Sequence, residues 1–376
     1  MRDLLGAGRT VVRAQARRRW SLVGALVLVL VAIPVALAHR PVPATEAAPG
    51  TLRGQIMTSA GRPFHGYAQS TGSLGLPALP GLAQVTAVLS GTTEMRVWYA
   101  APDRWRLDVL GPGTERDLYR TGHDQVVWDY GDNQLSLVLG EQPVRVPRAA
   151  DLTPPELARR LLSLATGDRL EPLPARRVAG VLAAGMRIVP VASGATVAYV
   201  DIWADRASGL PVLVEVTARG AGRPVFVTRF LELSLAAPAA EVLQPPARRP
   251  GTGFTTTDTG DLLGVLDRWD AVTPPDLLDG RPRLPAAGGV TALGAYGSGL
   301  ARFVVAGLPG RLGRDVYGDA ARWGRRLDVP GAEAVLIGAN PLNLLVVRAE
   351  RTWLVAGFVD EPVLRRVAAG LAGAAA

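Results

Sequence analysis

The stretch from residue 95 to residue 138 limits the possible folds of this chain more than any other. It contains five short segments in which apolar and polar side chains alternate, separated by turn-forming residues at intervals of roughly ten. In one of them Trp105, Leu107 and Val109 alternate with charged residues. A side-chain period of two is what a β-sheet with one buried and one solvated face requires. The stretch therefore predicts an antiparallel meander with an aromatic face.

The rest of the chain predicts an α+β fold. Residues 52–57 and 84–90 are expected as the first strands, with an irregular Gly/Pro-rich segment at 61–82 between them. Residues 153–166 predict a helix with a leucine stripe. Four further strands are expected at 178–191, 196–203, 212–218 and 225–233. Beyond them, helices are expected at 261–269, 315–325 and 361–371, and strands at 290–296, 301–306, 334–337 and 344–358.

Composition shifts along the chain divide it into six predicted segments. Residues 244–257 are rich in proline, arginine and glycine, which favours a domain boundary. The predicted segments are a basic leader at 1–19, an apolar segment at 20–38, a spacer at 39–50, a β-domain at 51–243, the linker at 244–257 and a smaller α+β domain at 258–376.

The apolar segment at 20–38 predicts a membrane helix. Its 19 uncharged residues would form about 28 Å of helix, close to the hydrocarbon thickness of a bilayer. Six arginines and one acidic residue stand within residues 1–20, so the segment is predicted to place the N-terminus in the cytoplasm and the bulk of the chain outside. An uncleaved single-pass anchor and a signal peptide cleaved after Ala36-Leu37-Ala38 both fit this pattern.

Charge and composition narrow the function classes. The leader holds a net charge of +5 out of a total of +8, which argues against a nucleic-acid-binding surface on the rest of the chain. The chain has no cysteine and no lysine, which excludes disulfides, thiolate metal sites and lysine nucleophiles. The three histidines show no metal-ligand spacing, and no nucleophile or phosphate-loop motif is present. The sequence therefore predicts a protein that is not an enzyme and that uses no cofactor or metal.

The apolar face of the meander must be covered by other parts of the chain. One short leucine-striped helix covers only part of a sheet of about ten strands, which favours a half-filled cavity suited to a lipid or acyl chain. A fully packed core without a ligand is the alternative. The predicted cavity-lining residues are Val97, Tyr99, Trp105, Leu107, Val109, Trp128, Tyr130, Leu135 and Leu137, with Leu157, Leu161 and Leu164 as the helical lid.

Two sequence motifs resemble a known family. RVWYAAPDRWRLDVL, followed by RTGHDQVVWDYGDNQLSLV, resembles the lipoprotein-carrier (LolA-like) proteins, and DIWADRASGLPVLVEV resembles a hairpin of the RseB/MucB group of periplasmic regulators. The resemblance spans about residues 52–235 and implies an incomplete antiparallel β-barrel wrapped over helices, with a cavity for acyl chains. It also implies the functions of these groups, in which LolA-like members carry lipoproteins or lipids and RseB-like members bind an anti-sigma factor. The arginine-, alanine- and glycine-rich composition suggests an actinobacterial-type, membrane-anchored member.

The sequence thus predicts a membrane-anchored extracytoplasmic protein that binds a lipid or lipidated partner such as a lipoprotein, for lipid handling or envelope sensing. A regulatory module that binds a membrane anti-sigma factor through its outer surface or C-terminal domain is the alternative.

Overall fold

The computed structural model describes residues 18–30, 47–75, 89–140, 148–258, 272–285 and 291–373. The chain divides into two compact units, Met1–Ala44 and Thr45–Ala376. In the first unit, residues 18–30 are helical. Among the residues described, none of the helices combines the length and apolarity needed to cross a bilayer. Residues 31–38 of the predicted membrane segment lie outside the described part of the chain.

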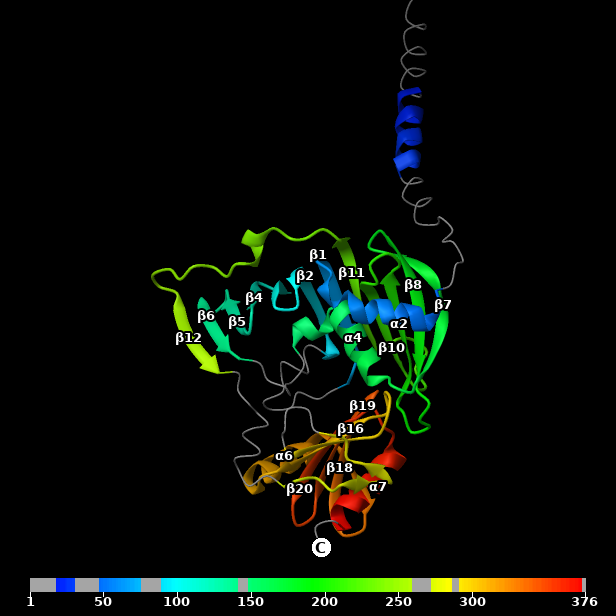
Figure 1. Ribbon diagram of the computed structural model, residues 1–376, viewed down its shortest axis with the longest axis vertical. Coiled ribbons are helices and arrows are strands. Elements are labelled where there is room, and N and C mark those ends of the chain that lie inside the picture. Colours follow the sequence, from blue (N-terminus) through cyan, green and yellow to red (C-terminus); the bar gives the residue numbers. More distant parts are fainter. Residues whose placement is uncertain are drawn as a thin grey trace, which may run out of the picture. The chain divides into compact units, whose positions relative to one another are not determined.

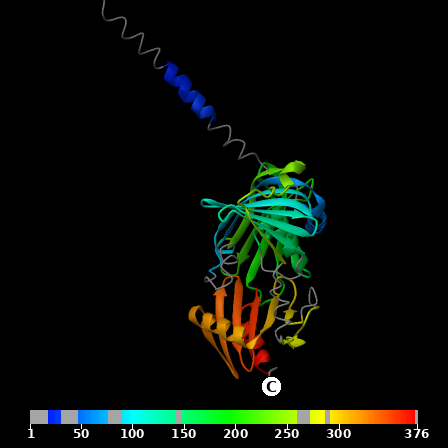
Figure 2. The same cartoon turned by 90° about the vertical axis from the view of Figure 1, so that its left-hand side faces the viewer.

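A sheet of twelve strands dominates the second unit, in the order β12-β6-β5-β4-β3-β2-β1-β11-β10-β9-β8-β7 (Figures 1 and 2). Neighbouring strands are antiparallel except β12 and β6, which are parallel. The sheet is open, because its end strands β12 and β7 do not pair with each other. The strands are β1 (Phe64–Gly72), β2 (Thr92–Ala101), β3 (Arg104–Gly111), β4 (Thr114–Thr121), β5 (Asp124–Asp129), β6 (Gln134–Leu139), β7 (Arg169–Val178), β8 (Val181–Val189), β9 (Val197–Asp205), β10 (Pro211–Ala218), β11 (Phe226–Ser234) and β12 (Gly253–Asp258). The predicted class is confirmed at this level, as a mostly β fold with some helices.

Two helices, α2 (Pro49–Thr58) and α4 (Pro154–Leu164), pack on one face of this sheet, which we call the inner face (Figure 1). Helix α2 contacts β7 and β8, and α4 contacts β10 and β11. Their buried side chains, among them Leu52, Ile56 and Leu162, form one core cluster with Met186 and Ile202 of the sheet. The helices are therefore concentrated over the β7–β11 half of the sheet.

Helix α2 corrects the strand predicted at residues 52–57. Leu52 and Ile56 are completely buried and lie four residues apart, which places them on one face of a helix. Pro49 occupies the first turn, where its missing N–H costs nothing. The short apolar run was ambiguous between strand and helix because only these two positions are buried.

Strand β1 corrects the irregular segment predicted at 61–82. It lies between β2 and β11 in the middle of the sheet. At Gly66 a Cβ atom would lie 2.2 Å from the carbonyl oxygen of Glu232 on β11, so the glycine is required by the close approach of two strands. The glycine that suggested irregular structure is therefore a packing requirement of a strand.

Other boundaries also differ from the sequence predictions. Strand β12 supplies an edge strand from within the predicted linker at 244–257. Residues 169–178, for which no strand was predicted, form β7. The predicted helix at 261–269 lies outside the described residues, as does most of the predicted strand at 84–90.

The C-terminal residues form a second, six-stranded antiparallel sheet in the order β15-β16-β20-β19-β18-β17. Its strands are β15 (Leu293–Tyr296), β16 (Phe303–Leu308), β17 (Arg325–Val329), β18 (Ala332–Ala339), β19 (Leu342–Arg348) and β20 (Thr352–Gly357). Helix α6 (Gly310–Trp323) contacts β18, β19 and β20, and helix α7 (Glu361–Gly373) contacts β17, β18 and β19. A short hairpin joins β13 (Leu277–Leu278) to β14 (Arg281–Pro282).

Candidate functional site

A cavity of about 940 Å³ lies against the inner face of β2 and β3. Residues around the short helices η1 (Ser59–Gly61) and η2 (Ala149–Leu152), residues of α4, and several residues of the C-terminal part also line it. The main apolar lining comes from adjacent strands of the large sheet: Phe64, Val97, Tyr99, Trp105 and Leu107. Cross-strand pairing explains this cluster, because Tyr99 lies opposite Trp105 and Val97 lies opposite Leu107, so all four share one face.

The aromatic rings of this wall are held rigidly. The rings of Phe64 and Tyr99 stack with centroids 5.0 Å apart, and Phe230 meets Phe64 edge-on at 5.6 Å. The Tyr99 hydroxyl donates a hydrogen bond of 2.7 Å to the Ala60 carbonyl oxygen, which ties β2 to η1. Burial raises the pKa of Tyr99 to about 12, so this hydroxyl stays protonated at physiological pH.

Charged side chains complete the lining, and the positively charged ones outnumber the negatively charged ones. The cavity is lined by two carboxylates, Asp151 and Glu156, and by five arginines: Arg120, Arg148, Arg159, Arg160 and Arg302. Arg160 pairs with Asp151 at 3.1 Å, and Arg159 pairs with Glu156. The Arg148 guanidinium donates to Gln125 Oε1 at 2.7 Å. The site therefore combines an apolar wall with a basic border.

Five of the predicted lining residues border this cavity: Val97, Tyr99, Trp105, Leu107 and Leu164. Val109 faces the same side of β3 but packs against the core cluster of Met95 and Val97. On α4, Leu161 is buried in the core between the helices and the β8–β10 strands, and Leu157 packs against that core. The predicted lid residues are thus divided between core and cavity.

The strand register corrects four of the predicted lining residues. Across β4, Leu107 on the inner face lies opposite Leu118, which lies opposite Val127 on β5. Val127 is therefore on the inner face, and its neighbour Trp128 points to the opposite, outer face. Leu135 pairs with Trp128 and follows it to the outer face. By the same alternation, the residues misassigned to the cavity are Trp128, Tyr130, Leu135 and Leu137.

Sequence reasoning missed Phe64 and all five arginines of the cavity. Phe64 lies in the segment predicted as irregular, and a residue outside any predicted strand has no predicted face. Arg159 and Arg160 lie together on α4, directly beside the leucine stripe, which was the one local signal available. Arg302 reaches the site from the loop before β16, far along the chain, and no local pattern indicates that.

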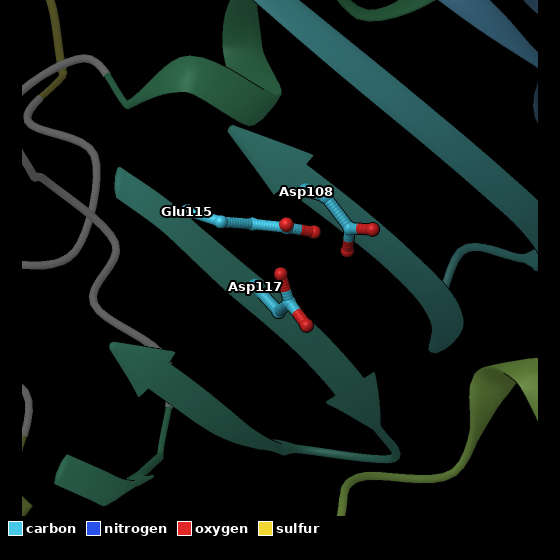
Figure 3. A group of neighbouring side chains, drawn as sticks. All are labelled: Asp108, Glu115 and Asp117. Atoms are coloured by element: carbon cyan, nitrogen blue, oxygen red, sulfur yellow. The ribbon is translucent and has the colours of Figure 1, made fainter. Parts of the chain in front are cut away.

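A second polar cluster lies on the outer face of β3 and β4, where the oxygens of Asp108, Glu115 and Asp117 come within 4.8 Å of one another (Figure 3). Arg106 already bridges two of them, with Nε 2.6 Å from Asp108 and Nη2 3.0 Å from Asp117. Burial and the neighbouring Asp108 raise the pKa of Asp117 to about 7. These carboxylates are the set among the described residues that could hold a cation, but an arginine occupies the position a cation would take.

Asp201, the one carboxylate within an apolar strand, lies on the outer face of β9. Its two oxygens accept hydrogen bonds from Arg187 at 2.6 and 2.7 Å, and the Arg187 guanidinium lies 3.7 Å from the centroid of the Tyr199 ring. This bidentate pair satisfies the carboxylate and leaves it no role in the cavity.

The chain is similar in structure to proteins of two groups. Against MucB of Pseudomonas aeruginosa, solved in a complex with MucA, it shows 18% identity and a TM-score of 0.47 over 86% of this chain and 97% of MucB. Against MucB solved alone, the values are 18% and 0.41 over 85% and 96%. Against a LolA superfamily protein from Nitrosomonas europaea, they are 10% and 0.25 over 53% and 98%. No protein-family model and no curated protein sequence matches the chain.

MucB and LolA-superfamily proteins are the groups whose motifs the sequence resembles. The actinobacterial assignment stays a prediction.

Proposed function

We propose that this chain is an extracytoplasmic binding protein that holds the apolar part of a lipid or of a lipidated partner in the cavity on its inner face. The observation that carries the proposal is the aromatic and aliphatic wall of Phe64, Val97, Tyr99, Trp105 and Leu107, which borders about 940 Å³ of space. Pockets for small ligands have volumes of roughly 300 to 1,000 Å³ and are mainly apolar with a few polar groups. The size and lining of this cavity fit that description.

The energetics favour an acyl chain as the apolar part. Each buried methylene contributes about 0.8 kcal/mol, so a chain of eight methylenes would gain roughly 6 kcal/mol from burial before the cost of immobilisation. A rigid wall reduces that cost on the protein side, because the Phe64 and Tyr99 rings are already fixed by stacking.

The proposal includes a membrane anchor formed by the apolar segment at residues 20–38, with the N-terminus in the cytoplasm. Its support is the uncharged length of the segment and the arginines before it. An anchored protein would present its cavity close to the bilayer, for lipid handling or envelope sensing.

Two tryptophans provide a matched test of the cavity. Trp105 lies on the inner face and borders the cavity, whereas Trp128 lies two strands away on the outer face. The full-length wild type, Trp105→Ala and Trp128→Ala are purified in an amphipathic polymer, and the amphiphiles extracted from each are measured by mass spectrometry per mole of protein. We expect Trp105→Ala to retain at least fivefold less of one amphiphile than the wild type and Trp128→Ala to retain the wild-type amount. Equal amounts in all three folded proteins would contradict the proposal.

A second candidate function is a regulatory module that binds a membrane anti-sigma factor through its outer surface. The observation that favours it is a row of side chains across the outer face, in which Trp128, Leu135 and Phe254 are aligned on β5, β6 and β12. Tyr130 and Phe254 are 54% and 37% exposed. A Tyr130→Ser/Phe254→Ser double variant should lose a single-pass membrane partner that the wild type and Trp105→Ala both retain. Retention by the double variant would exclude this surface.

A further inference from the structure

The end strands of the two large sheets differ in how they are protected from further pairing. An unpaired strand edge can pair with another chain, and folded proteins prevent this with prolines, charged side chains or covering segments. Strand β7 contains Pro172 and Pro174, which remove two backbone donors. Strand β17 is charged at three of its five positions. Strand β15 is covered, because the Leu284 amide donates a hydrogen bond of 2.8 Å to the Ala295 carbonyl oxygen.

The fourth end strand, β12, has none of these features. Its sequence GFTTTD contains no proline and no charge before Asp258, and threonine favours strands. Phe254, Thr255 and Thr256 are exposed. Strand β12 is the last strand of its sheet, and no described strand pairs with it on the side away from β6 (Figure 1). The free edge of β12 is therefore open to a further strand.

The pairing of β12 with β6 shows which backbone groups point to the free edge. The Gly253 amide donates a hydrogen bond of 3.0 Å to the carbonyl oxygen of Asn133, just before β6. The N–H and C=O groups of successive strand residues point to opposite sides, so Gly253 and Thr255 bond to β6. Phe254 and Thr256 then present their backbone groups to the free edge. These are the groups that a further strand would use.

We propose that this edge binds the same edge of a second copy of the chain, by antiparallel pairing of the two β12 strands about a twofold axis at Thr255. In this register Thr255 lies opposite Thr255 of the second copy, and Phe254 lies opposite Thr256 of the second copy. Thr–Thr pairs and pairs of an aromatic with a β-branched residue stabilise antiparallel strands. None of the residues from 253 to 257 is charged, so no like charges lie opposite each other.

The protection of the other end strands favours a second copy as the occupant. A twofold pairing uses the same residues from both copies and closes on itself. Because β7, β15 and β17 are protected, such a pair has no unprotected end strand in its large sheets and does not extend into a fibre. This inference goes beyond the proposed function, because it requires no ligand in the cavity.

A proline on the free edge tests the interface. Thr256→Pro removes an N–H that points away from β6, so β12 should stay paired with β6. Ala237→Pro, in the exposed connection after β11, is the control. Native mass spectrometry of the full-length chain, released from an amphipathic polymer over a dilution series, gives the dimer dissociation constant. Thr256→Pro should raise this constant at least tenfold, and Ala237→Pro should leave it unchanged. A monomeric wild type, or an unchanged constant for Thr256→Pro, would overturn the proposal.

An engineered cysteine tests the register and does not depend on how Thr256→Pro folds. The natural chain has no cysteine, so a single introduced thiol can form a disulfide only between two copies. Opposite residues of a non-hydrogen-bonded antiparallel pair have Cα atoms about 4.5 Å apart, within the range of a disulfide. Under mild oxidation Thr255→Cys should therefore cross-link at least tenfold faster than Thr121→Cys, at the exposed end of β4. Equal rates for the two variants would overturn the proposed pairing.

Discussion

The two halves of the twelve-stranded sheet are built from similar strands but are covered differently. In the β7–β11 half, α2 and α4 lie on the inner face, and Met186, Ile188 and Ile202 are completely buried beneath them. In the β2–β5 half, the corresponding inner-face residues Trp105 and Leu107 border the cavity. We call these the covered half and the open half.

Helix length explains the difference. Helices α2 and α4 have 10 and 11 residues, so each is about 16 Å long. Strands in a sheet are spaced about 4.8 Å apart, so such a helix spans roughly three or four of them. The two helices contact β7, β8, β10 and β11, and neither is long enough to extend over the meander as well. The open half is a consequence of too little helix for the width of the sheet.

The open half is stabilised in part from its outer face. There Arg106 bridges Asp108 and Asp117, and its guanidinium lies 4.9 Å from the Trp98 ring centroid and 5.1 Å from that of Tyr119. Asp108 and Asp117 are almost fully buried. The helix η3 (Ala240–Leu243), in the connection between β11 and β12, packs against β3. The covered half thus depends on apolar packing beneath its helices, whereas the open half combines an apolar core with a buried ionic cluster on its outer face.

The largest expected effect is the loss of that cluster. Arg106→Met removes the cation and leaves two buried carboxylates facing each other, which should lower the free energy of unfolding by about 3 to 5 kcal/mol. Arg116→Met is the control, because Arg116 pairs with Asp129 at the surface and its loss should cost less than about 1 kcal/mol. Urea unfolding of both variants at pH 7.5 measures the difference. Equal costs would show that the ionic cluster does not distinguish the open half.

The next effect compares the halves on a single helix. Leu162 of α4 is completely buried in the core of the covered half, whereas Leu164, two residues later, is only partly buried against the same core and borders the cavity. Leu162→Ala should cost about 3 kcal/mol because it creates a void in a close-packed core, whereas Leu164→Ala should cost less than about 1 kcal/mol. Thermal and urea unfolding give both values. A cost for Leu164→Ala as large as that for Leu162→Ala would mean that the cavity end of α4 is packed as closely as its buried face.

The sequence predicted that part of the sheet is incompletely covered, but it predicted only some of the residues that line the cavity there. Alternation within β2 and β3 placed Val97, Tyr99, Trp105 and Leu107 on one face, and the structure confirms that pattern. Alternation cannot say which face of the next strand continues it, because that depends on the register across the turns. β4 carries Arg116, Leu118 and Arg120 inward and the buried Asp117 and Tyr119 outward, so its own pattern gives no clear direction.

The same limit explains the misassigned strands. In β5 the residues Val126, Val127 and Trp128 are all apolar, so either face of the strand could be the inner one. The face with Trp128 was predicted to line the cavity, but the register places it on the outer side. Arg302 and Phe64 were beyond sequence reasoning for another reason. They approach the cavity from segments more than 200 residues apart, and only the tertiary fold brings them to one site.

The smallest effect for a single step in conditions concerns the pH dependence of the open half, taken one pH unit at a time. Burial and the neighbouring Asp108 raise the pKa of Asp117 to about 7, so the folded state binds this proton more tightly than the unfolded state, in which aspartate titrates near pH 4. Between about pH 4 and pH 7 the free energy of unfolding should therefore fall as pH rises, by about 1 kcal/mol per pH unit, and then level off. Asp117→Asn should remove much of this slope, and the rest belongs to Asp108, whose pKa burial also raises.

Asp129 on β5 provides the control for that slope. Desolvation opposes its ionisation, but hydrogen bonds from the Asp132 amide and from Arg116 outweigh it and hold the pKa of Asp129 below its usual range. Asp129 is then ionised in both states above pH 5, and Asp129→Asn should keep the wild-type slope between pH 5 and pH 7. Urea unfolding at half-unit pH intervals measures all three proteins. A slope that persists unchanged in Asp117→Asn would place the titrating group elsewhere and separate the ionic cluster from the pH response of this half.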